Sequence, residues 1–201
     1  MSRFRQIITQ ALKEAYGCSL HEEDTASDNE LIKVFDATKN TPVPLDIHMT
    51  KGEYKQNHRG KGQYADGTVF VWLYDYTSKK YLISQRADDG AWTQSAGGGM
   101  IESDKDFRDS AIRETQEELG YIPDDLHEIK ILPRGRDGIT GNWLGIFYCL
   151  VENGENIQFH LQQDEVSSVQ WATYDEIINN IGLINKFVTD SLNEVEKQIN
   201  K

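Results

Sequence analysis

Short hydrophobic runs separated by polar turns dominate the middle of the chain. The segment from Thr68 to Tyr74, TVFVWLY, is rich in β-branched and aromatic residues, and the segment from Tyr81 to Arg86 follows after a polar turn. Two further runs of this kind extend from Leu126 to Pro133 and from Asn142 to Val151. The pattern predicts four strands in this part of the chain.

A shorter leader precedes these strands. The segment from Glu30 to Ala37 is typical of a strand, and a turn with two prolines separates it from a candidate second short strand between Leu45 and Met49. The stretch at 51–62, KGEYKQNHRGKG, is basic and polar. We expect a solvated loop there, although such a loop could also close over a phosphate.

Apolar residues at helical spacing mark the two ends of the sequence. Residues 2–16 and 182–199 each have such a stripe, and Gly17 is a plausible stop for the first. Each stripe suits packing on the core or contact between two copies of the chain, so a homodimer is one of the assemblies that the sequence allows. We assign residues 1–29 to an N-terminal helix with an acidic loop and residues 30–201 to the main domain.

A strand followed by a short helix is predicted near residue 170. The run from Glu165 to Ala172 contains Trp171, which we expect in the core. Thr173 and Glu176 have the spacing of a capping box at the start of a helix, which explains Glu176 without any chemistry.

Composition narrows the classes of partner. The chain has 201 residues, 38% of them hydrophobic, and a net charge of −12, which argues against binding to nucleic-acid polymers or anionic membranes. No apolar run approaches membrane-spanning length. The two cysteines are far apart in sequence, which favours reduced thiols and a cytoplasmic location. The five histidines show no paired spacing typical of metal ligands.

The candidate chemistry lies in residues 97–121, GGGMIESDKDFRDSAIRETQEELGY. Glu114, Glu117 and Glu118 are spaced by three and four, so a helix projects them from one face, and Arg113 stands one turn before Glu117. Crowded carboxylates repel in a cleft of low dielectric, and a divalent cation removes that penalty. Oxygen ligands suit Mg²⁺ or Mn²⁺.

The ends of this helix and the glycines before it also have physical roles. We expect Ser103 or Asp104 to cap the helix and Gly120 to end it. Gly98 and Gly99 let the backbone approach a ligand and adopt positive φ where the turn needs it.

The spacing resembles a known pattern. Gly99, Arg113, Glu114, Glu117, Glu118 and Gly120 fall at the intervals of the Nudix box, which is Gly, five residues, Glu, seven residues, Arg-Glu-apolar-any-Glu-Glu-any-Gly-apolar. Two positions depart from it: Lys105 replaces the first Glu, and Thr115 replaces an aliphatic residue. The leader more loosely resembles the branch of this family related to isopentenyl-diphosphate isomerase.

The resemblance implies a fold and an activity. The implied fold is an α/β/α sandwich with a mixed sheet between helices. The implied activity is Mg²⁺- or Mn²⁺-dependent hydrolysis of a diphosphate linkage in a nucleoside diphosphate-X or related small substrate. The implied metal ligands are Glu114, Glu117, Glu118 and the carbonyl of Gly99. The residues expected to carry the chemistry are Glu117, Glu118, Arg113 and Glu165, with Asp164 and Glu152 as rivals of Glu165 for the role of base.

Four residues are candidates for contact with the substrate, each with a plainer alternative. Arg86 stands at a strand end near the expected mouth of the site, but it could equally pair with a neighbouring aspartate. Arg134 and Arg136 lie in a Gly-rich link and could meet phosphate or belong to an ordinary hairpin. Trp92 could stack on a base or support the loop from beneath.

Two other functions are compatible with the same family. Lys105 favours a nucleotide-binding module without catalysis. If this position instead limits the turnover of an enzyme, replacing Lys105 by Glu should raise that turnover. Isopentenyl-diphosphate isomerase chemistry uses a Cys near the loop before the glycines, and this chain has Trp92-Thr93-Gln94-Ser95 there. The sequence therefore disfavours the isomerase.

Overall fold

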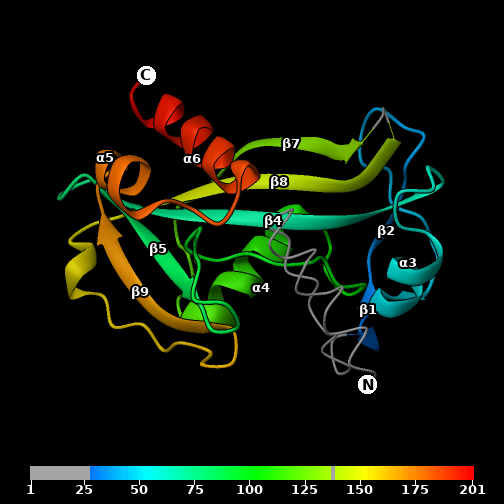
Figure 1. The fold of residues 1–201 in the computed structure, drawn as a ribbon, viewed down its shortest axis with the longest axis horizontal. Helices are drawn as coiled ribbons and strands as arrows, with labels where there is room; N and C mark the ends of the chain where they lie inside the picture. Colours follow the sequence, from blue (N-terminus) through cyan, green and yellow to red (C-terminus); the bar gives the residue numbers. More distant parts are fainter. Residues whose placement is uncertain (1–27, 137–138) are drawn as a thin grey trace, which may run out of the picture.

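A computed structural model describes residues 28–136 and 139–201 (Figure 1). The helix predicted over residues 2–16 lies outside these described residues. The strands are β1 (Leu31–Ile32), β2 (Val34–Asp36), β3 (Met49–Thr50), β4 (Tyr64–Asp75), β5 (Lys80–Arg86), β6 (Trp92–Thr93), β7 (Leu126–Arg136), β8 (Ile139–Val151) and β9 (Val166–Ala172). The helices are α3 (Lys51–Asn57), α4 (Phe107–Leu119), η1 (Gly154–Asn156), α5 (Tyr174–Glu176), the π-helix η2 (Ile177–Ile181) and α6 (Lys186–Ile199).

A mixed sheet forms the middle layer. Its strands follow the order β6-β5-β4-β8-β7, with β2 added beside β4 and β9 beside β5. Strands β4 and β8 pair in parallel from Asp66 with Asn142 to Asp75 with Val151, whereas the other pairs of this sheet are antiparallel. The four strands predicted from hydrophobic runs are all present in it.

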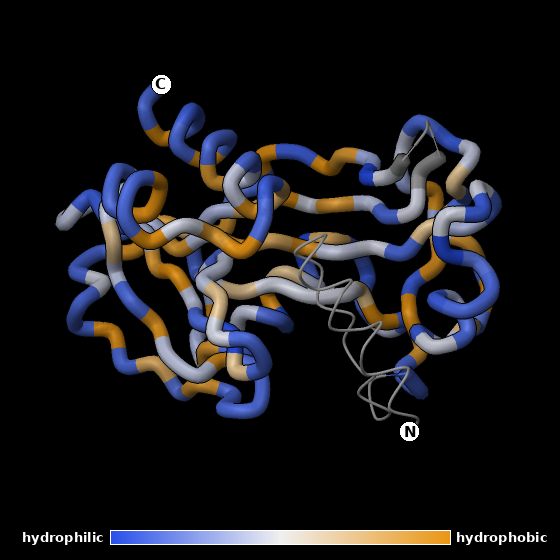
Figure 2. Tube along the Cα trace, in the orientation of Figure 1, coloured by the Kyte–Doolittle hydropathy of each residue, from blue (hydrophilic) through white to orange (hydrophobic). Residues whose placement is uncertain are grey.

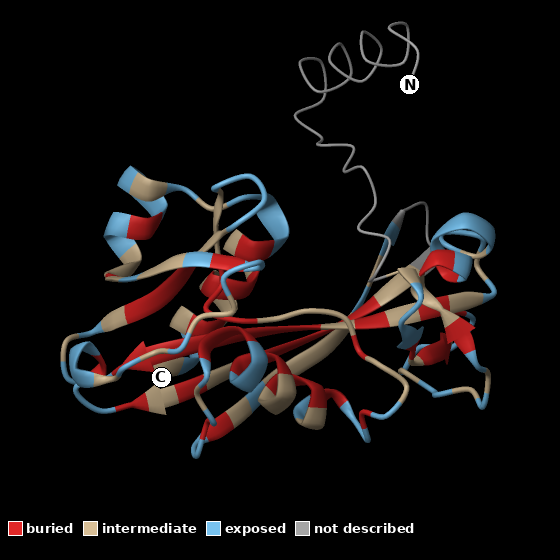
Figure 3. Ribbon diagram, turned by 90° about the horizontal axis from the view of Figure 1, so that it is seen from below, coloured by how far each residue is buried: buried red, intermediate tan, exposed pale blue. Residues whose placement is uncertain are grey.

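Alternate residues of β4 face two different cores. Val69, Val71 and Leu73 pack in one cluster with residues of α4, whereas Phe70 and Trp72 pack in another with residues of α6. The period of two along a strand produces this division. The sheet therefore lies between helices, which confirms the predicted α/β/α sandwich. Figure 3 shows that the long strands are buried over most of their length.

A hydrogen bond and an apolar stripe fix α6 on its face of the sheet. Trp72 Nε1 donates to Ser191 Oγ at 3.0 Å, and Val188, Leu192 and Val195 are buried beneath the helix. Figure 2 shows hydrophobic and hydrophilic residues alternating along the turns of α6. The predicted helix over 182–199 begins later than expected, at Lys186, because Asn185 caps it by accepting from the N–H groups of Phe187 and Val188.

The leader forms a small lobe at one end of the sheet. The prediction of a solvated loop over residues 51–62 was wrong for 51–57, which form α3. Thr50 caps this helix by accepting from Glu53 N, and Tyr54 is buried with residues of β1, β2 and β3. A polar helix is stable here because its one large apolar side chain is anchored in the lobe.

Strands β4 and β5 diverge, and the glycine-rich loop fills the gap. The two strands pair only through Tyr74 with Tyr81 and Asp75 with Lys80. Beyond that point the loop at 96–100 takes the neighbouring position, since Val71 N donates to Ala96 O at 2.8 Å and Val69 N donates to Gly98 O at 2.9 Å. The sheet thus positions the glycines directly before α4.

Candidate active site

Helix α4 has a defined start and end. Asp106 caps it by accepting from Asp109 N at 2.8 Å, so the prediction that Ser103 or Asp104 would be the cap was wrong. Asp104 has a different partner, described below. Gly120 ends the helix in the left-handed conformation with φ of 63°, as predicted. Phe107 and Leu119 are buried at the two ends, which holds the helix against the sheet.

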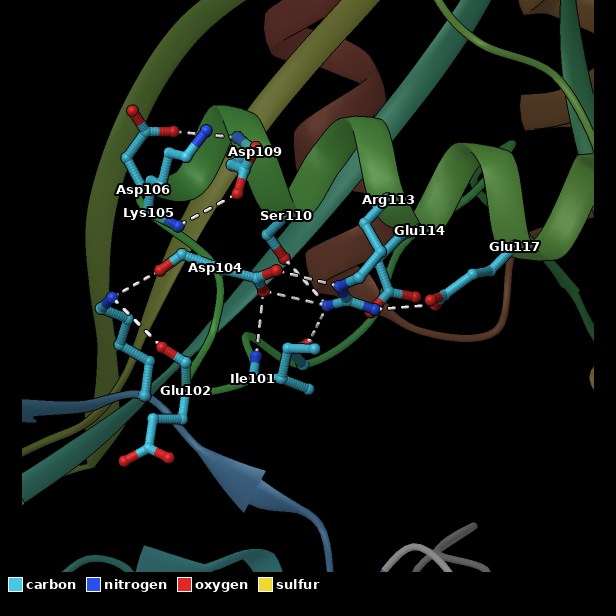
Figure 4. Close-up of polar contacts among 12 residues, drawn as sticks. Ile101, Glu102, Asp104, Lys105, Asp106, Asp109, Ser110, Arg113, Glu114 and Glu117 are labelled. Carbon is cyan, nitrogen blue, oxygen red and sulfur yellow. Dashed lines mark hydrogen bonds and ion pairs between the residues drawn. The ribbon is translucent and has the colours of Figure 1, made fainter. Parts of the chain in front are cut away.

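Arg113 contacts five residues around the start of α4, among them Ser110, whose Oγ accepts from Nη2 at 3.4 Å (Figure 4). Its Nε and Nη2 donate to the two carboxylate oxygens of Asp104, both at 3.0 Å. Its Nη1 lies 2.8 Å from Glu117 Oε2 and 2.9 Å from Glu114 Oε1. Its Nη2 also donates to the carbonyl oxygen of Gly99 at 2.9 Å. The predicted contact between Arg113 and Glu117 is therefore present.

The guanidinium of Arg113 stays charged in this setting. Partial burial acts to lower the pKa of Arg113, but its hydrogen bonds to Asp104 and the charges of Glu114, Asp104 and Glu117 outweigh it and raise that pKa. One positive charge is thus shared among three carboxylates, so the acidic group keeps an excess of negative charge.

Glu114 and Glu118 are the buried carboxylates of α4, with 7% and 8% of their surface exposed. Burial raises the pKa of Glu114 to about 7, against the lowering effect of Arg113. Burial and the charge of Glu114 raise the pKa of Glu118 well above its ordinary value, although Gly97 N donates to Glu118 Oε2 at 3.1 Å. The two acids lack enough positive charge around them to favour ionisation.

The glycines before α4 make room for one of these acids. A Cβ atom on Gly98 would lie 2.5 Å from Glu114 Oε2, whereas a Cβ on Gly99 would meet nothing within 4 Å. Neither residue has a positive φ, so the expectation of positive φ at Gly98 and Gly99 was wrong. Gly98 is needed for the close approach of the Glu114 carboxylate instead.

Glu165, which directly precedes β9, lies near the same acidic group. The chain before it runs along the end of α4, where Gln162 N donates to Glu118 O at 3.0 Å, and Glu165 O accepts from Ala87 N next to the end of β5. Burial raises the pKa of Glu165, and the charge of Asp164 adds to this while Lys51 opposes it. The fold therefore brings Glu165 close enough to α4 for its charge to raise the pKa of Glu114 and Glu118, and its role as a base stays a prediction.

Arg86 stands at the end of β5, paired with the aspartates that follow it. Its Nε donates to Asp88 at 3.0 Å and to Asp89 at 3.3 Å, and its Nη2 also pairs with Asp88. The plainer of the two interpretations of Arg86 is therefore present. Arg86 is also close enough to Glu118 to lower the pKa of that acid.

Arg134 and Trp92 lie on the sheet face that α6 covers. The Arg134 guanidinium carbon is 4.1 Å from the ring centroid of Phe187 and 5.9 Å from that of Phe70. Trp92 packs against the same cluster and accepts a hydrogen bond from Ile184 N. Arg136 is the last residue of β7, beside the gap at 137–138, and its predicted role stays a prediction. The contacts described for Arg134 and Trp92 are with this face of the sheet and α6, and none is with the carboxylates of α4.

The donor set fits a divalent metal by its chemistry. Glu114, Glu117 and Glu118 offer carboxylate oxygens, which Mg²⁺ and Mn²⁺ prefer, and the burial that raises the pKa of Glu114 and Glu118 makes their ionised forms costly without a nearby cation. Within residues 28–136 and 139–201, however, no three acidic, His or Cys side chains converge as a ready-made metal site. Arg113 holds Glu114 and Glu117 in their present positions.

Sequence reasoning missed one carboxylate of the site. Asp104 is only 3% exposed and makes the bidentate pair with Arg113. Lys105, which departs from the family pattern, is exposed. The sequence signal for Asp104 was an acidic residue directly before position 105, where the family pattern has Glu. The place of Lys51 at the start of α3 was also missed, because residues 51–62 were predicted to form a loop.

A mixed sheet between helices, with a glycine-rich loop leading into an acidic helix, defines the class of this protein as an α/β/α sandwich. A family model described as the NUDIX domain matches residues 65–191. The chain belongs to this family. In addition, the part of the chain that the structure describes contains no helix long and apolar enough to cross a membrane.

Related sequences come from plants and bacteria. The chain is 35% identical over 119 residues to the uncharacterized Nudix hydrolase YfcD of Salmonella typhi, covering 56% of this chain and 59% of that protein. It is 29% identical over 154 residues to Nudix hydrolase 3 of Arabidopsis thaliana, covering 67% of this chain and 20% of that protein. The matched part thus spans about three-fifths of the bacterial relative and a fifth of the plant one.

Solved structures share the fold at low identity. DR0079 from Deinococcus radiodurans superposes with a TM-score of 0.60 at 12% identity, covering 82% of this chain and 98% of that one. The NUDIX domain of Shewanella oneidensis NrtR, complexed with ADP ribose, gives 0.57 at 20%, covering 75% and 99%. The Ap4A hydrolase of C. elegans gives 0.53 at 17%, covering 68% and 98%.

Proposed function

We propose that this protein is a hydrolase that uses Mg²⁺ or Mn²⁺ to cleave a diphosphate linkage in a nucleoside diphosphate-X or a related small substrate. The observation that carries the proposal is the pair of buried acids on α4. Glu114 and Glu118 lie beside the glycine loop with too little positive charge around them. Such an arrangement is costly for the fold alone and useful for holding a cation.

Each residue of the proposed site would have a separate role in hydrolysis. Glu114, Glu117 and Glu118 would hold the metal, which when bound would polarise the phosphate oxygens and lower the pKa of a water molecule. Glu165 is the candidate proton acceptor, because burial raises its pKa above the ordinary value of 4.5 and it lies near α4. Arg113 would hold Glu117 and the Gly99 carbonyl in place.

Cations and aromatic rings around the acidic group would bind the substrate. Arg86 lies nearest, and a bound phosphate would compete with Asp88 and Asp89 for its guanidinium. Arg134, stacked on the half-exposed ring of Phe187, could contact a planar group or an outer phosphate. We keep Arg136 and Trp92 as further candidates. The ADP ribose and Ap4A of the structural neighbours supply the first substrates to test.

The proposal is tested with a panel of substrates. The purified protein is incubated with nucleoside di- and triphosphates, ADP-ribose, NADH, dinucleoside polyphosphates and prenyl diphosphates, with Mg²⁺, with Mn²⁺ and with a chelator. We expect metal-dependent release of a phosphomonoester or phosphate from at least one of them, and loss of this activity in Glu117→Gln and Glu118→Gln. Activity that persists unchanged in both variants would refute the assignment.

A second candidate is a nucleotide-binding module without catalysis. Arg113 already forms ion pairs with Glu114 and Glu117, two of the three α4 acids. No ready-made metal site is present among the described residues. Calorimetric titration separates the two functions. A module would bind nucleotides such as ADP-ribose without metal, whereas the hydrolase requires Mg²⁺ or Mn²⁺ binding at micromolar to millimolar concentrations.

The isomerase is not favoured. Cys149 is fully buried in the core between the sheet and α4, and burial raises the pKa of its thiol to about 11. A thiol in this state is a poor acid or base near neutral pH. A proton-exchange assay on isopentenyl diphosphate tests the remaining possibility directly.

A further inference from the structure

The two-pronged ion pair of Arg113 is made with a residue outside the family pattern. Asp104 receives both Nε and Nη2 of Arg113 at 3.0 Å, and its Oδ2 also accepts from Ile101 N at 2.9 Å. A bidentate pair of this kind fixes the plane of the guanidinium as well as its position. Because Asp104 is almost completely buried, neither partner can turn into solvent without breaking the pair.

The leader lobe holds Asp104 from the other side. Lys33 Nζ donates to the backbone carbonyl oxygens of Glu102, at 3.5 Å, and of Asp104 (Figure 4). The backbone adds two more bonds, from Lys33 N to Met100 O at 3.1 Å and from Glu102 N to Leu31 O at 2.9 Å. The loop at 100–104 is thus fastened to β1 and β2, which are far from it in sequence.

Lys105 takes no part in this network through its side chain. The residue is exposed, and its backbone N donates to Asp109 Oδ2 at 3.1 Å. The carboxylate expected at position 105 is therefore supplied from position 104, while the lysine points away from Arg113 (Figure 4).

The charge balance explains why this matters for the acids of α4. Arg113 gives two of its nitrogens to Asp104, and its third contacts Glu114 and Glu117. If Asp104 lost its charge, the guanidinium would be neutralised by Glu114 and Glu117 alone. Those acids would then be less available to a cation.

We propose that Asp104, held by Lys33, is the positioning residue of the acidic helix and replaces the missing Glu of the family pattern. It orients Arg113 and takes up part of its charge, so that Glu114 and Glu117 remain able to hold a divalent metal. This inference rests on the proposed metal-dependent function, but its first part, the orientation of Arg113, is independent of any metal. Lys105 then does not limit activity, which decides a question that the sequence left open.

The experiment compares Asp104→Asn with Lys105→Glu, and uses Asp109→Asn as the control that removes one carboxylate from the same turn. Two quantities are measured: the hydrogen-exchange rate of the Arg113 Nε–H group by NMR in the metal-free protein, and the dissociation constant for Mn²⁺ by electron paramagnetic resonance. The Arg113 signal is assigned by its loss in Arg113→Lys. Circular dichroism verifies that each variant is folded.

We expect Asp104→Asn to speed the Arg113 exchange and to weaken Mn²⁺ binding by about tenfold or more, the scale seen when groups that orient metal ligands are removed. Lys105→Glu and Asp109→Asn should leave both quantities within about twofold of the wild type, because neither side chain contacts Arg113. The double variant Asp104→Asn/Lys105→Glu should regain part of the loss if Glu at 105 can reach Arg113.

Unchanged exchange and unchanged Mn²⁺ affinity in Asp104→Asn would overturn the inference, and so would a tenfold gain in affinity in Lys105→Glu. If the wild type binds no Mn²⁺, the proposed function fails, and the exchange rate alone decides the role of Asp104. Should Asp104→Asn not fold, Lys33→Met takes its place. Faster Arg113 exchange in Lys33→Met would support the inference, and an unaltered rate would contradict it.

Discussion

Gly98 lies directly against the carboxylate of Glu114, so closely that a single added methyl group would stand 2.5 Å from its Oε2 atom. The glycine is there because of this contact, and the turn itself does not require it. Glu114 is enclosed between the loop and the helix on which it stands, and it keeps its position only while residue 98 has no side chain.

This contact predicts the effect of Gly98→Ala. The new Cβ would displace the flexible end of Glu114, so the fold should survive while the position of one metal ligand changes. We expect Mn²⁺ affinity and turnover to fall by about tenfold or more, as for other disturbances of ligand orientation. The melting temperature should change little. Titration calorimetry and thermal unfolding measure the two effects.

Gly99→Ala is the matched control, because a Cβ at that position meets nothing within 4 Å. It should keep the metal affinity of the wild type. Equal losses in Gly98→Ala and Gly99→Ala would show that the loop needs flexibility rather than room for Glu114.

The raised pKa of Glu114 predicts how the stability of the metal-free protein depends on pH. Its folded pKa of about 7 exceeds the ordinary value of 4.5, so the stability contributed by the neutral form is complete below pH 4.5 and is lost as the pH rises through 7. Glu114→Gln stays neutral throughout. In the presence of a chelator it should be more stable than the wild type at pH 8, by at most about 3.5 kcal/mol, since one pKa unit corresponds to roughly 1.4 kcal/mol.

Urea unfolding at pH 5 and pH 8 measures this difference. The advantage of Glu114→Gln should shrink toward pH 5, and Glu117→Gln, which alters a half-exposed acid, should show a small difference at both values. A Glu114→Gln variant that is less stable than the wild type at pH 8 would mean that the carboxylate is well compensated without metal.

The backbone conformation of Gly120 predicts that a substitution at this end of α4 lowers the stability of the protein. Its φ is 63°, and a Cβ would lie 2.7 Å from His160 Cβ. Gly120→Ala should therefore cost about 1–2 kcal/mol for the left-handed backbone, plus the cost of moving His160. Urea unfolding measures the loss, with Gly99→Ala as the control, because Gly99 has no positive φ and a Cβ there meets nothing within 4 Å. A loss well under about 1 kcal/mol in Gly120→Ala would contradict the strain at this position.

The sequence predicted the parts of the fold that depend on local pattern. The run at 68–74 and its partner at 81–86 are strands because their β-branched and aromatic residues suit a buried sheet. The acidic face of α4 followed from its spacing. Helix α3 was missed because most of its residues are polar, although Thr50 and Glu53 have the spacing of a helix start.

The site was harder to predict because long-range contacts decide it. Nothing local indicates that Lys33 would reach the carbonyl of Asp104, 71 residues away, or that Asp104 would be buried against Arg113. Arg134 is a second example. Its stacking on Phe187, across the sheet from α4, could not be predicted from its basic neighbourhood, and its contact with phosphate stays a prediction.

The binding of Mn²⁺ to the wild type and to Glu118→Gln, followed by electron paramagnetic resonance, tests the central claim most directly because it needs no knowledge of the substrate. Glu118 is buried beside Glu114, and its replacement changes charge with little change in shape. We predict saturable binding in the wild type and an affinity lower by about tenfold or more in the variant. Equal Mn²⁺ binding by both proteins, or none by either, would contradict the account.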